Sequence, residues 1–221
     1  SMDAIKSILL VIDPTVEEDP AVDRALDIAA ATRASVVLFV NNENTLTERS
    51  YIYEGVDGDF FENQRRLFKE HYSKILTKAE QRFRDKGIEV STRFKEQHHL
   101  AESIIAEVEV VRPELVVKST HHHNVLERSL ISNTDWRLIR KCPAPLMLVK
   151  PRPWVENGVV VTAVDPLHSK AAQSRLDHVL LSATMQISKA MGMTPRVFHS
   201  YYPFVSTLFP MGGSSREHLD R

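Results

Sequence analysis

Uninterrupted runs of large apolar residues, separated by segments with helical spacing, constrain the fold of this chain most. SILLVI begins at Ser7 and SVVLFV begins at Ser35, and neither run alternates apolar with polar residues. Strands that are apolar throughout are typical of parallel sheets, which helices cover on both faces. Between the two runs, apolar residues recur at Val22, Ala25 and Ala29, which is the spacing of an amphipathic helix. The chain therefore opens as strand, helix and parallel strand.

The same alternation continues to residue 150. Three further strands are expected at residues 88–94, 114–117 and 146–150, and three further helices at residues 59–86, 100–111 and in the segment through Trp136 and Ile139. The strand at 88–94 alternates in polarity, so we expect it to be half-buried at an edge of the sheet. Five strands alternating with helices predict a doubly wound α/β domain with right-handed crossovers.

After residue 150 the opening pattern starts again. GVVVTAVDP, from Gly158, repeats the apolar run and the Asp-Pro pair of SILLVIDP, so that Asp165 corresponds to Asp13. A helical segment at residues 174–191, a turn at Gly192 and the strand PRVFHSY follow, in the opening order of the first domain. We predict a complete domain at residues 1–150, a proline-containing linker at 151–157, and the start of a second similar domain at 158–221. This organisation indicates a piece of a larger tandem protein.

Composition excludes several classes of protein. Lys and Arg number 28 and Asp and Glu number 29, so the net charge of −1 gives no general attraction to nucleic acid. No apolar run approaches the ~20 residues that a membrane-spanning helix needs. Cys142 is the single cysteine, so no intramolecular disulfide can form. These features predict a cytoplasmic protein without a nucleic-acid partner or a membrane span.

The order of elements resembles the universal stress protein family. The resemblance rests on VIDP after the first strand, on VVKS, on TDWRLIRKCPAPLMLVK and on a following Pro-Trp linker, and it covers residues 5–150. The tandem-domain E type of the family is the most similar. The resemblance implies an adenine nucleotide alpha hydrolase-like sheet of order 3-2-1-4-5. It also implies association through the fifth strand, from Leu146 to Lys150, either between domains or in a homodimer.

Nucleotide-binding members of that family carry three spaced glycines after the fourth strand, followed by Ser or Thr. Glycine lets the backbone approach phosphates closely and adopt positive φ. Lys118, His121 and Ile131 stand at these glycine positions here, and no glycine lies between residues 88 and 157. Only Ser132, at the hydroxyl position, and Asp13, which the resemblance places near adenine or ribose, are kept. We therefore predict no cofactor, with no ATP site in the first domain.

The residues that remain at this position predict a different binding site. Asp13, Lys118, His121, His123 and Ser132 are the candidate residues for a small-molecule ligand, anionic or amphipathic, at the switch point of the sheet. Alternative roles remain for some of them. Asp13 could instead form a turn or cap before a proline. The histidines could be exposed loop residues, or His121 and His123 could bind a metal with a third ligand from elsewhere.

Catalysis has little support in the sequence. No GxSxG nucleophile elbow occurs. For Cys142 we expect a buried packing role, and for Trp136 a place in the core or in an interface. The expected function is that of a non-catalytic stress-response protein that acts as a sensor or scaffold for a non-nucleotide ligand. The alternatives are ATP or AMP binding through the second domain, and weak nucleotide hydrolysis.

Overall fold

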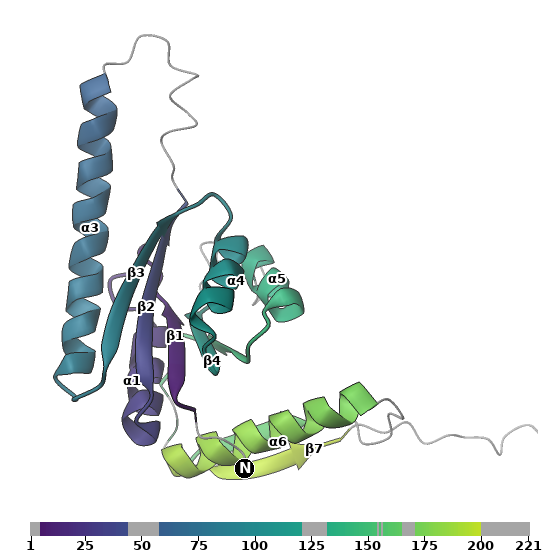
Figure 1. Ribbon diagram of the computed structural model, residues 1–221. Helices are drawn as coiled ribbons and strands as arrows, with labels where there is room; N and C mark the ends of the chain where they lie inside the picture. Colours follow the sequence, from purple (N-terminus) through teal and green to yellow (C-terminus); the bar gives the residue numbers. More distant parts are fainter. Residues whose placement is uncertain are drawn as a thin grey trace, which may run out of the picture.

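A computed structural model of the chain describes residues 5–43, 58–120, 132–153, 155, 157–164 and 171–199 (Figure 1). Its main body is a parallel sheet of β1 (Ser7–Val11), β2 (Ser35–Asn42), β3 (Val90–Glu96), β4 (Leu115–Ser119) and β5 (Leu146–Val149). The strands lie in the order β3-β2-β1-β4-β5, which confirms the order expected from the resemblance. The three central strands are largely buried, as their uniformly apolar sequences predict.

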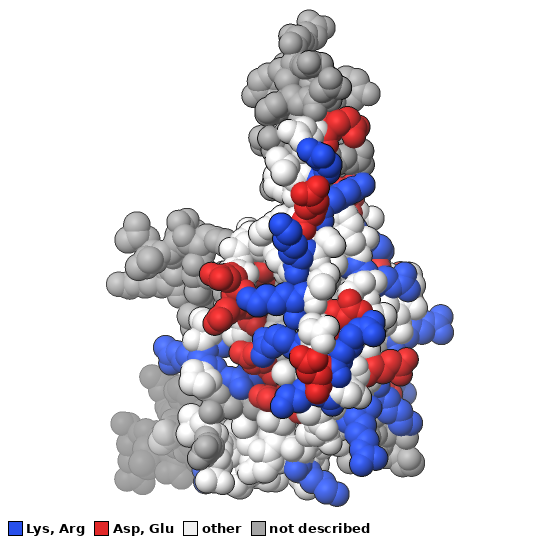
Figure 2. All heavy atoms as spheres, turned by 90° about the vertical axis from the view of Figure 1, so that its left-hand side faces the viewer, with Lys and Arg blue, Asp and Glu red and all other residues white. Residues whose placement is uncertain are grey.

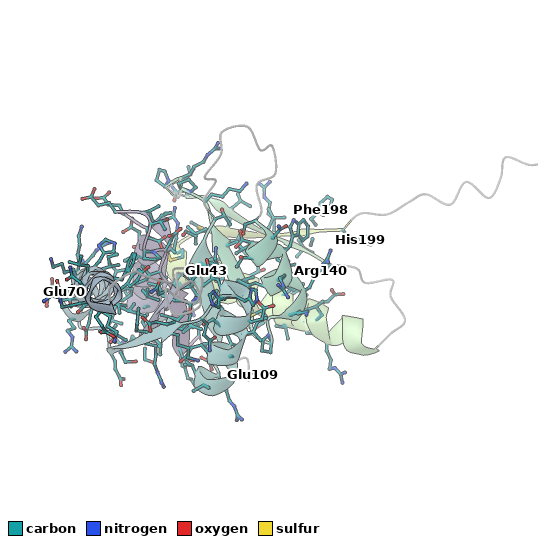
Figure 3. The ribbon with its side chains drawn as sticks, turned by 90° about the horizontal axis from the view of Figure 1, so that it is seen from above. Glu43, Glu70, Glu109, Arg140, Phe198 and His199 are labelled. Carbon is teal, nitrogen blue, oxygen red and sulfur yellow. The ribbon has the colours of Figure 1, made fainter. Side chains whose placement is uncertain are left out.

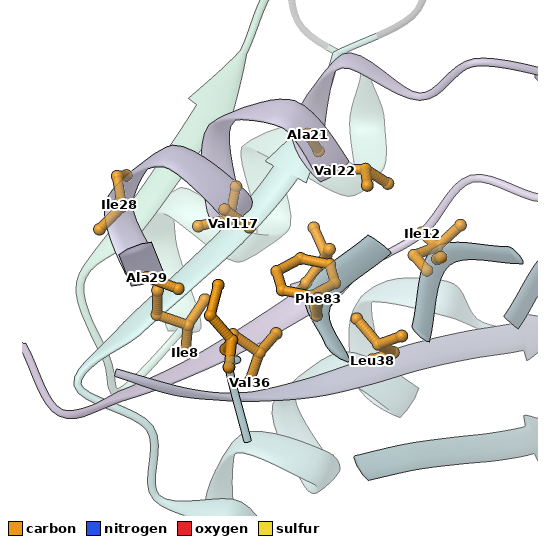
Figure 4. Close-up of a cluster of buried hydrophobic side chains, with 14 of the residues drawn as sticks. Ile8, Ile12, Ala21, Val22, Ile28, Ala29, Val36, Leu38, Phe83 and Val117 are labelled. Carbon is orange, nitrogen blue, oxygen red and sulfur yellow. The ribbon is translucent and has the colours of Figure 1, made fainter. Parts of the chain in front are cut away.

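Helices cover both faces of this sheet. α1 (Pro20–Thr32) and α3 (Gly58–Arg84) lie on one face, and α4 (Leu100–Val111) and α5 (Asn133–Lys141) lie on the other (Figure 1). Alternate residues of each strand enter different clusters, because successive side chains point to opposite faces. Ile8 belongs to the cluster that contains Phe83 of α3, part of which Figure 4 shows, whereas Leu9 belongs to the cluster that contains Leu138 of α5. The sheet therefore separates two apolar cores.

Local sequence sets the limits of α1. Asp19 caps its first turn, where Oδ1 accepts a hydrogen bond of 2.9 Å from the backbone N of Ala21. Pro20 follows at the first helical position, where a missing N–H costs nothing. The helix ends at Arg33, whose φ of 60° is left-handed. This cap also fixes the chain just after β1, because Asp19 Oδ2 accepts a hydrogen bond from the backbone N of Asp13.

α3 is the longest helix that the structure describes, with 27 residues. Its first half extends beyond the strand ends in Figure 1, and Figure 2 shows side chains of both charges along it. Its second half contacts the sheet through Tyr72, Leu76, Ala79 and Phe83, at steps of three and four residues. The helical spacing predicted for residues 59–86 is thus confirmed, because the apolar stripe must face the core over this half.

β3 differs from its prediction in position and in burial. It runs from Val90 to Glu96 rather than over residues 88–94, and most of its residues, including Phe94, are exposed. The alternation in sequence predicted one buried face. Glu107 of α4 lies beneath this strand and pairs with Lys95 at 2.7 Å, so an ion pair replaces part of the expected apolar contact.

The second unit begins as the sequence predicts. β6 (Val159–Ala163) and β7 (Thr194–Phe198) form a two-stranded parallel sheet, connected by α6 (Ala171–Met191). α6 also packs against the first unit, where Ile187 reaches the larger core. The backbone N of Ile5 donates a hydrogen bond of 3.1 Å to Oε1 of Gln186, which joins the start of β1 to this helix.

Candidate functional site

A cavity of about 290 Å³ lies at the carboxyl ends of β1 and β4. This is the switch point of the sheet, since the chain leaves β1 toward one side and β4 toward the other. Seven of its lining residues carry carboxylate, ammonium or hydroxyl groups that define its chemistry: Asp13, Thr15, Glu43, Tyr72, Lys118, Ser132 and Thr134. Asn41 and Leu100 are among the other lining residues. Three predicted site residues, Asp13, Lys118 and Ser132, therefore share one cavity.

Asp13 holds the turn that follows β1 and also lines the cavity. Its Oδ1 accepts hydrogen bonds from the backbone N of Thr15 at 2.8 Å and from Thr15 Oγ1 at 2.6 Å. This is the local turn that Asp before Pro favours. The predicted turn role is thus present in the structure. It does not exclude a role in binding, because the same carboxylate borders the cavity.

Lys118, near the end of β4, points its ammonium at a buried carboxylate. Nζ donates a hydrogen bond of 2.9 Å to Oδ1 of Asp135 and one of 2.8 Å to the carbonyl oxygen of Ser119. The side chain of Lys118 is 13% exposed and that of Asp135 is 1% exposed. A buried carboxylate needs such a partner, because desolvation of an unpaired charge costs several kcal/mol, about 3–5 when one partner is removed. The Lys118 ammonium, which the sequence analysis assigned to ligand binding, is therefore already paired with Asp135.

Ser132 begins α5 in a reciprocal capping box. Its Oγ accepts a hydrogen bond of 3.1 Å from the backbone N of Asp135, and Asp135 Oδ2 accepts one of 3.2 Å from the backbone N of Ser132. The hydroxyl that resembles the last position of the nucleotide loop is thus engaged in the helix cap. Asp135 connects this cap to Lys118, so the two cavity residues share one buried partner.

Tyr72 and Glu43 are cavity residues that the sequence did not indicate. Tyr72 is buried, comes from α3 and donates a hydrogen bond of 3.2 Å to Oδ1 of Asn42. Burial raises the pKa of its phenol, and the carboxylates of Asp13, Glu43 and Glu96 raise it further. Tyr72 occupies an apolar position of the α3 stripe, so its pattern predicts a core residue only.

Glu43 follows β2 and caps a neighbouring helix. Its Oε1 accepts a hydrogen bond of 3.0 Å from the backbone N of Leu100, at the start of α4. His99, the N-cap residue of that helix, makes no capping hydrogen bond with its side chain. Figure 3 shows Glu43 between Glu70 of α3 and Arg140 of α5, in the middle of the molecule. In the sequence, the only indication of a role for Glu43 is that it is a polar residue directly after a buried strand.

The other predicted residues have varied outcomes. His121 and His123 lie outside the described residues, so their roles stay predictions. Cys142 packs beside the α4 and α5 core, and burial raises the pKa of its thiol. Trp136 is 46% exposed, which corrects the prediction of a core place and leaves that of an interface. Within the described segments, no three His, Cys, Asp or Glu side chains gather in a metal-binding arrangement.

Comparison with known proteins agrees with this architecture. The family model described as "Universal stress protein family" matches residues 4–150. The chain belongs to the universal stress protein family. Within the family, it is 28% identical over 207 residues to universal stress protein E of Salmonella typhi, and 27% identical over 207 residues to that of Escherichia coli K12. Each alignment covers 90% of this chain and 62% of the relative.

A solved structure extends the similarity to the arrangement in space. The crystal structure of a functionally unknown protein from Pseudomonas aeruginosa PAO1 matches with a TM-score of 0.70 and 27% identity. That match covers 90% of this chain and 62% of the other. The chain thus spans 62% of the length of these relatives, and its fold is a universal stress protein domain with the start of another. In the described part of the chain, no helix has the length and apolar character to span a membrane.

Proposed function

We propose that this protein is a non-catalytic member of the stress response that binds a non-nucleotide ligand in the cavity at the ends of β1 and β4. The observation that carries the proposal is the ion pair of Lys118 with Asp135. Lys118 stands where the resemblance places the first glycine of a phosphate loop. With glycine at this position, a phosphate loop has no side chain there, and its backbone amides can contact the phosphate. In this protein the Lys118 side chain and its buried partner Asp135 occupy that space.

The backbone supports the same conclusion. A phosphate-cradling loop depends on free amide N–H groups. The amide of Thr120, just beyond β4, donates a hydrogen bond of 2.7 Å to the carbonyl oxygen of Val149. That amide is therefore engaged with β5 rather than free for an anion.

The test is native mass spectrometry of the gently purified protein, alone and with excess ATP and Mg²⁺. We expect no nucleotide adduct, and retention of a small molecule that Asp13→Asn removes. Asn keeps the oxygen that accepts from Thr15, so the turn after β1 survives. Glu109→Gln, an exposed change on α4, is the matched control. Stoichiometric ATP that Asp13→Asn abolishes would refute the proposal. ATP binding that Asp13→Asn leaves intact would place a nucleotide site in the second unit.

The scaffold role would use the edge strand β5. Leu146 and Met147 pack against the two cores, whereas Leu148 is half-buried and belongs to neither cluster. An unpaired strand edge tends to seek a partner. We expect the protein to sediment as a dimer and Leu148→Lys to sediment as a monomer with unchanged circular dichroism. A wild-type protein that sediments as a monomer at all concentrations would contradict association of two copies through β5.

A further inference from the structure

The charged groups that face the cavity are unevenly compensated. Lys118 is its one described cation, and Asp135 already pairs with it in a buried position. Asp13 and Glu43 also line the cavity, and no ion pair between described residues involves either of them. Their described contacts are hydrogen bonds from neutral groups of Thr15 and Leu100. Two carboxylates therefore face the cavity without a cation of their own from the described part of the chain.

The pKa of Tyr72 is further evidence that the electrostatic potential at the cavity is negative. Beyond the effect of burial, the carboxylates of Asp13, Glu43 and Glu96 each disfavour ionisation of the Tyr72 phenol. Asp13 follows β1, Glu43 follows β2 and Glu96 ends β3, so these carboxylates act on Tyr72 from the carboxyl ends of three strands. The Tyr72 ring itself belongs to an aromatic group, with centroids 6.4 Å from Phe68 and 5.6 Å from Phe94. Of these three rings, that of Tyr72 lines the cavity. Carboxylates beside an aromatic ring favour bound cations.

We propose that the cavity binds a small organic cation, an amine or guanidine, and that Asp135 determines this preference by neutralising Lys118. The inference rests on the proposed function and names the ligand class of that same site. A volume of about 290 Å³ suits a small molecule. An anion would approach the two carboxylates, and the described lining residues offer no unpaired cation to offset the repulsion. A metal ion is disfavoured because the described residues offer no cluster of three ligating side chains.

Isothermal titration calorimetry of the full chain tests the ligand class. The probes are 1,4-diaminobutane, inorganic phosphate and Mg²⁺, each added to protein freed of co-purified molecules. We expect 1,4-diaminobutane to bind and the other two to give no heat of binding. Glu43→Gln keeps an oxygen that can accept the hydrogen bond from the backbone N of Leu100, and it removes one negative charge. It should therefore weaken the binding of 1,4-diaminobutane by about tenfold. Glu109→Gln, well away from Glu43 in Figure 3, should leave it unchanged.

The role of Asp135 needs a change of charge at constant shape. Asp135→Asn frees the Lys118 ammonium, so we expect weaker 1,4-diaminobutane binding and measurable phosphate binding. The double variant Lys118→Met with Asp135→Asn removes the pair without changing net charge, so it should bind the amine like the wild type. Phosphate binding by the wild type, or a double variant that folds but loses the amine, would overturn the assignment to Asp135.

The outcomes separate this inference from the proposed function. If an uncharged or anionic molecule co-purifies in the cavity and 1,4-diaminobutane does not bind, the cation assignment fails while the binding function stands. If Mg²⁺ binds and Glu43→Gln removes it, the site is a metal site and the organic cation is excluded. If ATP binds through Asp13, both proposals fail together.

Discussion

The β1–β2 pair and the β6–β7 pair have nearly the same local structure and opposite environments. Both are parallel ladders of five paired residues, each connected by a helix. Phe39 lies opposite Val11 in the first pair, and Phe198 lies opposite Ala163 in the second. Phe39 is fully buried, whereas Phe198 is 55% exposed. A strand can thus form from its local sequence without any guarantee that its side chains are covered.

Coverage by helices explains the difference. β1 and β2 have α1 and α3 on one face and α4 on the other, so the apolar side chains of the ladder are covered on both faces. β6 and β7 contact α6, and Val161 and Val197 remain exposed on the described structure. Burial of a side chain stabilises in proportion to the apolar area removed from water. The two pairs should therefore respond very differently to the same substitution.

The largest expected effect comes from matched truncations of the two phenylalanines. Phe39→Ala removes a fully buried ring and should lower the free energy of unfolding by about 3–5 kcal/mol. Phe198→Ala should change it by no more than about 0.5 kcal/mol, because its ring is mostly in water already. Urea denaturation followed by circular dichroism measures both. Equal losses would show that β7 is covered in solution and would remove the contrast between the two pairs.

A smaller effect is expected in thiol chemistry. Burial raises the pKa of Cys142, so less thiolate is present at a given pH than for an exposed cysteine. We expect alkylation by iodoacetamide at pH 8 to be about tenfold slower than for Val197→Cys in a Cys142→Ser background. The Cys142 rate should keep rising with pH after the rate at position 197 has levelled off. Similar rates and pH profiles at the two positions would contradict the contrast in burial.

The smallest expected effect comes from the N-cap of α1, the helix that connects β1 to β2. Asp19→Ala removes the acceptor for the backbone N of Ala21 and for that of Asp13. The loss should be about 1 kcal/mol, typical of a helix N-cap. Asp23→Ala is the control, because its exposed ion pair with Arg82 should contribute less than about 0.5 kcal/mol. Thermal denaturation compares the two variants, and a greater loss from Asp23→Ala would contradict the importance of the cap.

Much of the fold follows from the sequence alone. Apolar runs predict β1, β2 and β4, and helical spacing predicts α1, α3 and α4, because each pattern reflects a backbone period. The apolar run after Gly158 also forms the strand that its sequence predicts, β6. The order of strands needed the family resemblance. No local pattern states which strands lie side by side, because their pairing is a long-range contact.

For the site, the sequence placed Asp13 and Lys118 at the carboxyl ends of apolar strands, and the family resemblance added Ser132 at the hydroxyl position. Their meeting in one cavity follows from the parallel sheet. Only the tertiary structure decided that Lys118 pairs with Asp135, and that Tyr72 and Glu43 complete the walls. Those contacts join elements far apart in the chain. The interaction energy of a charged side chain with a ligand depends on the neighbouring charges and on burial, and sequence spacing specifies neither.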